Sequence, residues 1–83
     1  MVYFYMPTVA KIGSYRFFFF SNEGSEPPHI HVESLDAYAK FWLEPVSLAK
    51  SIGYNASELT RLRKLVLEHE ERFQERWHEH FGR

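Results

Sequence analysis

Residues 27–33 read Pro-Pro-His-Ile-His-Val-Glu, and this stretch indicates a β-strand that carries polar side chains on one face. The two prolines favour a loop before the strand, because proline fixes its backbone φ and lacks an N–H donor. After them, His29, His31 and Glu33 alternate with apolar residues. Alternate residues of a strand share a face and lie about 6.5–7 Å apart. We therefore expect both imidazoles and the carboxylate on one face of one strand.

The residues around this stretch predict an antiparallel sheet. Gly13-Ser14 separates two apolar segments by the two-residue spacing that is typical of a hairpin, with glycine supplying a positive φ. We expect four strands, at residues 8–12, 15–21, 29–33 and 38–44. Pro45 ends the fourth strand, and residues 48–54 are expected to form a short helical turn that ends at Gly53.

From Asn55 onward the apolar period changes to that of a helix. Asn55 and Glu58 have the spacing of a capping box, which favours a helix start. The apolar stripe consists of Leu59, Leu62, Val66, His69, Phe73 and Trp77. We expect one long amphipathic helix over residues 55–81, ending near Gly82. The predicted fold class is α+β: an antiparallel meander of about four strands (residues 8–44), with the helix packed across one face.

Strand alternation sorts the side chains of this sheet between two faces. The face that packs against the helix should contain Ile30, Val32, Phe41 and Leu43. The open face should contain His29, His31 and Glu33, together with Lys11, Arg16, Phe18, Phe20, Lys40 and Trp42. Cations that bind phosphates, interleaved with aromatic rings that stack on bases, are what a single-stranded RNA site requires. We therefore interpret Lys11, Lys40, Phe18, Phe20 and Trp42 as RNA-binding residues.

The candidate catalytic residues are His29, His31, Glu33 and Arg16. Two imidazoles on either side of a phosphodiester act as general base and general acid in the cleavage of RNA. Glu33 would orient an imidazole, and Arg16 would bind the developing charge of the phosphorane through two parallel hydrogen bonds. This mechanism needs no metal and no cofactor.

Two other interpretations of the same residues stay open. His29, His31 and Glu33 could form a triad of two imidazoles and one carboxylate, which suits a divalent transition metal in a metal-dependent hydrolase. Exposed aromatic side chains next to charged ones also describe a non-catalytic surface that binds RNA or protein.

The composition limits the class of protein. The chain has 83 residues and a formal net charge of −1, so we expect a single domain (1–83) and at most a local basic patch. Cysteine is absent, which excludes disulfides and thiolate metal sites and fits a cytoplasmic location. The N-terminus resembles neither a signal peptide nor a membrane span. Residues 1–5 are interpreted as an N-terminal extension before an alternative start at Met6.

Three segments of the sequence resemble a small bacterial family described as a domain of unknown function. They are residues 6–33, with Gly-Ser-Tyr-Arg-Phe-Phe-Phe-Phe and Glu-Pro-Pro-His-Ile-His-Val-Glu; residues 39–46, Ala-Lys-Phe-Trp-Leu-Glu-Pro-Val; and residues 58–62, Glu-Leu-Thr-Arg-Leu. The resemblance covers residues 6–83, and members are similar to the toxin of the type II toxin–antitoxin pairs called DhiT/DhiA.

This resemblance implies a growth-inhibiting toxin that acts on RNA. It also implies a cognate antitoxin, encoded by a neighbouring gene, as the partner protein. From the residues and the resemblance together we expect a toxin that is a metal-independent ribonuclease, with no membrane partner. Self-association of the toxin stays open, as do the two alternatives above.

Overall fold

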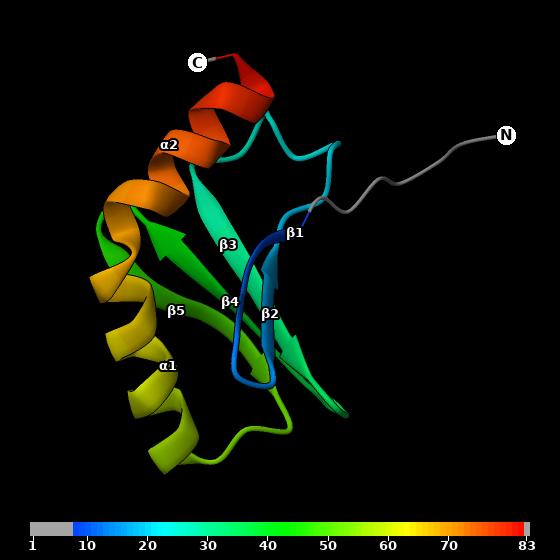
Figure 1. The fold of residues 1–83 in the computed structure, drawn as a ribbon, viewed down its shortest axis with the longest axis vertical. Coiled ribbons are helices and arrows are strands. Elements are labelled where there is room, and N and C mark those ends of the chain that lie inside the picture. The colour runs from blue at the N-terminus through cyan, green and yellow to red at the C-terminus, as the bar shows by residue number, and fades with distance from the viewer. Residues whose placement is uncertain (1–7, 83) are drawn as a thin grey trace, which may run out of the picture.

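The computed structural model describes residues 8–82 and consists of one antiparallel sheet with two helices on one of its faces (Figure 1). The strands are β1 (Thr8–Ile12), β2 (Tyr15–Phe18), β3 (His29–Ser34), β4 (Ala37–Leu43) and β5 (Val46–Ile52). They lie in the sheet in sequence order, and each neighbouring pair is antiparallel. The helices are α1 (Ala56–Glu68) and α2 (Glu70–Phe81). The predicted α+β class with an antiparallel meander is confirmed.

The prediction of four strands is wrong by one, because residues 46–52 form the strand β5. A helical turn was expected over residues 48–54. Pro45 instead lies in the tight turn between β4 and β5, and β5 then pairs with β4, with Lys50 opposite Lys40. The preference of Leu-Ala-Lys for a helix is small, and the hydrogen bonds that β4 offers outweigh it.

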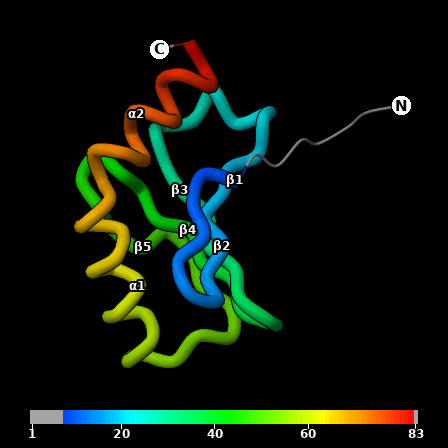
Figure 2. Tube along the Cα trace, viewed as in Figure 1, coloured from blue at the N-terminus to red at the C-terminus, as the bar shows by residue number. Residues whose placement is uncertain are grey.

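The predicted single helix is instead two helices that meet at His69 (Figure 2). His69 has φ −110° and ψ 13°, which departs from helical geometry. Its ring Nδ1 donates a hydrogen bond to the Leu65 carbonyl (2.9 Å), which also accepts the backbone N–H of His69 (3.1 Å). A side chain that enters the helical hydrogen-bond ladder bends a helix. The bend lets α1 contact β5 while α2 contacts β3 and β4.

The core lies between the helices and the face of the sheet that alternation predicts. Its sheet side contains the four residues expected there, Ile30, Val32, Phe41 and Leu43, each at most 1% exposed. Its helix side contains Leu62 and Val66 of α1 and Phe73 and Trp77 of α2. The register of the sheet therefore follows the hydrophobic pattern.

The predicted turns and helix ends are also present. Asn55 accepts a hydrogen bond from the Glu58 N–H (2.8 Å), and Glu58 accepts one from the Asn55 N–H (3.1 Å), which completes the capping box. Gly13 has φ +59° in the first hairpin, and Gly82 has φ +70° at the end of α2. In the turn between β3 and β4, Leu35 has φ +48°, which is unusual for a residue with a Cβ atom.

The N-terminal extension and the alternative start at Met6 lie outside the described residues. Within residues 8–82, neither α1 nor α2 has the length and apolar character needed to span a membrane.

Candidate functional site

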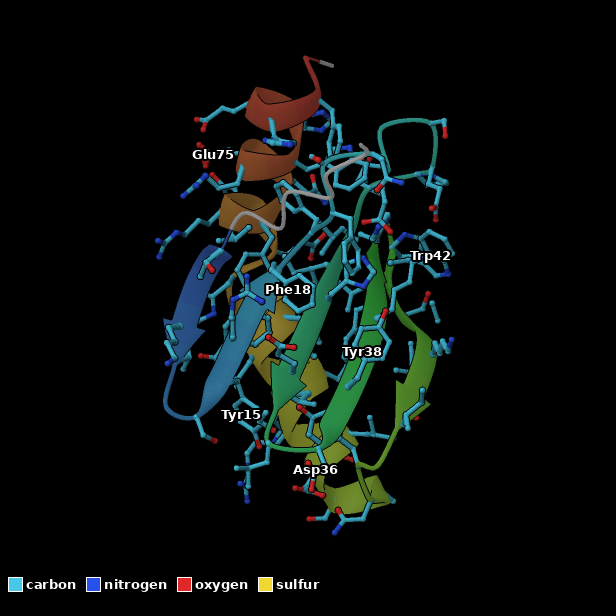
Figure 3. All side chains as sticks on the ribbon, turned by 90° about the vertical axis from the view of Figure 1, so that its right-hand side faces the viewer. Tyr15, Phe18, Asp36, Tyr38, Trp42 and Glu75 are labelled. Atoms are coloured by element: carbon cyan, nitrogen blue, oxygen red, sulfur yellow. The ribbon has the colours of Figure 1, made fainter. Side chains whose placement is uncertain are left out.

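The face of the sheet that the helices leave open carries the histidines of β3 (Figure 3). Phe18 of β2 is paired with His31, and His31 is paired with Lys40 of β4. His29 is paired with Trp42. Phe18 and Trp42 point toward the viewer in Figure 3, while the helices lie behind the sheet. Basic, aromatic and imidazole residues thus share this face, as the sequence predicts, but Phe18, His29 and His31 are buried in it (3%, 0% and 2% exposed).

The loop between β2 and β3, residues 19–28, folds over one end of the open face. It includes residues 19–21, which the sequence wrongly assigned to the second strand. Inside it, the Glu23 carboxylate accepts a hydrogen bond from the Phe20 N–H (3.0 Å), and the Glu23 N–H donates to the Phe20 carbonyl (3.3 Å). Gly24 lies against the end of α2, where a Cβ atom would be 2.8 Å from the Phe81 ring. These contacts fix the loop so that Glu23 points back toward β3.

Glu23 places its carboxylate on both histidines of β3. Its Oε1 lies 2.8 Å from Nε2 of His31 and 2.8 Å from Nε2 of His29, and its Oε2 lies 3.0 Å from Nε2 of His31. The two imidazole rings meet edge to face with their centroids 5.0 Å apart. We call these three residues the Glu23–His29–His31 cluster.

The other nitrogen of each imidazole has its own partner. Nδ1 of His29 lies 2.9 Å from the Pro27 carbonyl, and because a carbonyl can only accept, Nδ1 carries a proton. Nδ1 of His31 lies 2.6 Å from the Tyr38 hydroxyl. When Nε2 of His31 donates to Glu23, the Tyr38 O–H donates to Nδ1 of the neutral ring. Both rings are thus fixed in orientation, with Nε2 toward the carboxylate.

Both histidines are covered by aromatic rings. His29 is 0% exposed and packs against Trp77 of α2, with ring centroids 4.7 Å apart. His31 is 2% exposed and lies between Phe18 and Tyr38, whose centroids are 5.3 and 5.7 Å away in stacked orientation. The imidazoles therefore contact protein groups instead of solvent.

Burial and hydrogen bonding shift the pKa of two groups in opposite directions. Burial alone would raise the pKa of Glu23, but the contacts with His29 and His31 and the Phe20 N–H outweigh it and hold this pKa well below the usual 4.5. Glu23 is therefore an anion at neutral pH. Burial raises the pKa of Tyr38 to about 12, with a contribution from the charges of Glu23 and Glu26. Tyr38 therefore keeps its proton at neutral pH.

Glu33 does not orient an imidazole, although it shares the face of His29 and His31. Its Oε2 accepts a hydrogen bond from Nη1 of Arg16 (2.8 Å), and Nε of Arg16 donates to Thr8 Oγ1 (2.8 Å). The structure brings His29 and His31 together as expected. It places Glu33 with Arg16, and Glu23 occupies the position beside the imidazoles.

The predicted RNA-binding residues lie on the open face or at its edge. Nζ of Lys40 lies 4.5 Å from the centre of the Trp42 ring and donates to Glu26 Oε1 (2.8 Å). The centroid of the Phe20 ring lies 4.8 Å from that of His31 and 5.5 Å from that of Phe18. Lys11 is exposed on β1, opposite Arg16. The Arg16 guanidinium itself lies 4.5 Å above Phe18.

Sequence reasoning missed Glu23 and Tyr38. Glu23 belongs to a loop, where no periodicity indicates the direction of a side chain. Tyr38 could have been found, because it lies on β4 two residues before Lys40, the partner of His31, and therefore on the same face as His31.

Residues 14–78 match the family described as a domain of unknown function (DUF4160). The chain belongs to this family. No curated protein and no solved structure matches the chain. The range that matches DUF4160 begins just before β2 and ends within α2, so it contains Glu23, His29, His31 and Tyr38. The cluster and its surroundings therefore lie within the DUF4160 domain itself.

Proposed function

We propose that this DUF4160 protein is the toxin component of a type II toxin–antitoxin pair, and that it acts on single-stranded RNA held on the open face of its sheet. The similarity of its sequence motifs to the DhiT toxin motivates the first part. The observation that carries the second part is the row of basic and aromatic side chains on the open face, where Lys40 lies over the half-buried Trp42 and Arg16 lies over the buried ring of Phe18.

The chemistry of this face suits an RNA strand. Aromatic rings stack on unpaired bases and cations contact phosphates. Lys40 and Arg16 are paired with Glu26 and Glu33. Phosphates would have to compete with these carboxylates, so RNA binding should be moderate in affinity and strongly weakened by salt.

A ribonuclease reaction is the more specific form of this proposal, and the burial of the histidines sets a condition on it. Direct proton transfer requires an imidazole nitrogen within hydrogen-bond distance of the RNA. Because His29 and His31 are covered, residues 19–28 would have to move before either ring reached a phosphate or a ribose. The Glu23–His29–His31 cluster favours a metal-dependent hydrolase as the second candidate.

The edge strand β5 is the surface that we assign to the antitoxin. An edge strand offers unpaired backbone N–H and C=O groups, to which a partner can add a further strand. Most of β5 is exposed, including Leu48 (44%) and Ile52 (55%), which are large apolar side chains. A strand of the antitoxin would cover both.

A growth assay tests the toxin function. Expression of this chain alone should slow bacterial growth, and co-expression of the neighbouring small protein should restore it. Normal growth at a high level of soluble protein would contradict the toxin function.

RNA binding is tested separately, with a labelled single-stranded oligonucleotide and fluorescence anisotropy. Loss of one stacked base costs about 1–3 kcal/mol, so Trp42→Ala should weaken binding roughly 5- to 150-fold. Lys64→Ala removes an exposed cation on α1, which covers the other face, and should leave the affinity unchanged. Equal effects of both substitutions would show that the open face is not the RNA site.

The antitoxin surface is tested by co-purification. Ile52→Lys places a charge where the partner strand would lie, and should abolish co-purification while the far-ultraviolet circular dichroism stays unchanged. Arg63→Glu, on the exposed side of α1, is the control and should retain the antitoxin. Retention by the Ile52 variant would exclude β5 as the docking edge.

A further inference from the structure

We propose that Glu23, His29 and His31 bind a divalent transition-metal ion through one carboxylate oxygen and the two Nε2 atoms. The proposal goes beyond RNA binding and does not depend on it. In this site Glu23 takes the place of Glu33, the carboxylate of the metal triad that the sequence suggested, because Glu33 is paired with Arg16.

The distances fit such a site with a small adjustment. The three donor atoms lie within 4.8 Å of one another. Bonds of about 2.0–2.1 Å to zinc place tetrahedral ligands roughly 3.3 Å apart. Oε1 of Glu23 is 2.8 Å from each Nε2 atom, so the carboxylate would move back by about half an ångström to admit an ion. Two imidazoles and one carboxylate are a donor set that zinc and other divalent transition metals accept.

The surroundings of the two imidazoles have the arrangement typical of metal-binding histidines. Such a histidine binds the metal through one nitrogen and donates the other N–H to a carbonyl or another polar group, which fixes the tautomer. Nδ1 of His29 donates to the Pro27 carbonyl. Nδ1 of His31 faces the Tyr38 hydroxyl, whose oxygen can accept a hydrogen bond from the Nδ1–H when Nε2 binds a cation. Both Nε2 lone pairs then point into the cluster.

Nε2 of His29 is the atom that points most directly to a missing ligand. It is buried, and among residues 8–82 no group makes an aligned hydrogen bond to it, although Glu23 Oε1 is only 2.8 Å away. With the proton on Nδ1 directed at Pro27, a neutral His29 ring would therefore turn the Nε2 lone pair toward an anionic oxygen. Two acceptors at this distance repel each other unless a cation or a proton lies between them.

A pocket next to the cluster provides access for an ion. It has a volume of about 290 Å³ and is lined by Phe20, Asn22, Glu23 and Glu26. The Glu23 side chain forms part of its wall and is 13% exposed, so it connects the buried imidazoles to solvent. The two acidic residues of the pocket attract a cation.

Titration of the untagged protein with Zn²⁺, after removal of metals by EDTA, tests the proposal. Isothermal calorimetry should show one ion bound per chain. His29→Gln and His31→Gln should each weaken Zn²⁺ binding at least about 100-fold, because each removes a ligand. His78→Ala removes an exposed histidine of α2 and should leave binding unchanged.

Two further measurements keep the test decisive if a histidine variant fails to fold. Co²⁺ added to the wild-type protein should give the intense visible absorption of a four- or five-coordinate site. Tyr38→Phe keeps the stacked ring but removes the hydroxyl, and should weaken Co²⁺ and Zn²⁺ binding about 10- to 100-fold.

A wild-type protein that binds neither Zn²⁺ nor Co²⁺ would overturn the proposal and assign a proton to the place between His29 and Glu23. Binding that His78→Ala abolishes, and that Tyr38→Phe leaves intact, would overturn it too, since the ion would then lie on α2. Failure of RNA binding in the anisotropy experiment has no bearing on these results.

Discussion

The guanidinium of Arg16 donates a 2.8 Å hydrogen bond to Glu33, so the carboxylate of the histidine strand is bound to a neighbouring strand instead of to the histidines. Glu33 keeps 46% of its side chain exposed in this pair. Glu23, by contrast, is 13% exposed and contacts two imidazoles and a backbone N–H. The carboxylates of Glu23 and Glu33 should therefore differ in their contributions to stability.

Glu23→Gln should lower the free energy of unfolding by about 1.5–3 kcal/mol, the usual value of hydrogen bonds to a charged group. Glu33→Gln removes an exposed ion pair and should cost less than about 1 kcal/mol. Urea unfolding at pH 7, with EDTA present to exclude metal, measures both. Equal losses would contradict the assignment of Glu23 as the buried partner of the histidines.

Leu62→Ala should lower the free energy of unfolding by about 2–5 kcal/mol, because Leu62 is 0% exposed between α1 and the sheet. Leu67→Ala on the same helix is the matched control. Leu67 is 42% exposed, and its truncation should stay within about 0.5 kcal/mol. Chemical unfolding of the two variants gives the comparison. A thermal midpoint of Leu62→Ala equal to that of the wild type would show that the helix stripe is not part of the core.

Tyr54 should make the protein less stable as the pH rises above 10. Burial raises the pKa of Tyr54 above its usual 10.0, and this outweighs the opposing effect of its 2.8 Å hydrogen bond with Ser34. The unfolded chain then loses the tyrosine proton at a lower pH than the folded chain, so stability falls with rising pH above 10.

Tyr54→Phe removes this contribution. The stability of the variant should therefore fall less steeply than that of the wild type between pH 10 and the pKa that Tyr54 has in the folded chain. The stability of each protein below pH 10 gives its baseline. The baseline of the variant is lower by a constant amount, because the hydrogen bond between Tyr54 and Ser34 is lost. Tyr38, whose pKa is raised to about 12, contributes to the slope of both proteins. Identical slopes would show that Tyr54 ionises as easily in the folded chain as in the unfolded one.

Leu35→Asn should raise the free energy of unfolding by about 1 kcal/mol. Leu35 has φ +48°, a conformation that costs a residue with a branched apolar side chain about 1–2 kcal/mol and that asparagine tolerates. The Leu35 side chain is fully exposed, so its loss removes no core contact. Asp36→Asn, at the next position of the same turn, should change stability by no more than about 0.5 kcal/mol. Lower stability of Leu35→Asn would show that Leu35 contributes contacts that outweigh this strain.

The parts of the fold that the sequence could predict are those governed by local periodicity. Alternation placed Ile30 on the core face and His31 on the open face, and the spacing of Asn55 and Glu58 predicted the helix start. β5 was missed because its central Leu-Ala-Lys has a local preference for helix, whereas its strand conformation depends on pairing with β4.

The candidate site was only half predictable for the same reason. His29 and His31 follow from the pleat of one strand. Glu23 reaches them because the β2–β3 loop packs against Phe81, and a contact between a loop and a distant helix leaves no periodic signal in the sequence. The bend at His69 likewise depends on a hydrogen bond from its side chain to the Leu65 carbonyl. The apolar stripe continues regularly through His69 and therefore does not indicate this bend.

The order of the strands in the sheet has a kinetic consequence. Each strand pairs with the next one in sequence. The polar cluster and Tyr38 accordingly come from neighbouring elements, and all four residues lie in the short stretch between Phe18 and Trp42. Contacts between residues close in sequence close small loops and cost little chain entropy, which is the property of rapidly folding proteins. The β3–β4 hairpin, which brings His31 beside Tyr38, can thus form at an early stage of folding, whereas Glu23 joins the histidines only when its loop packs against Phe81 of α2.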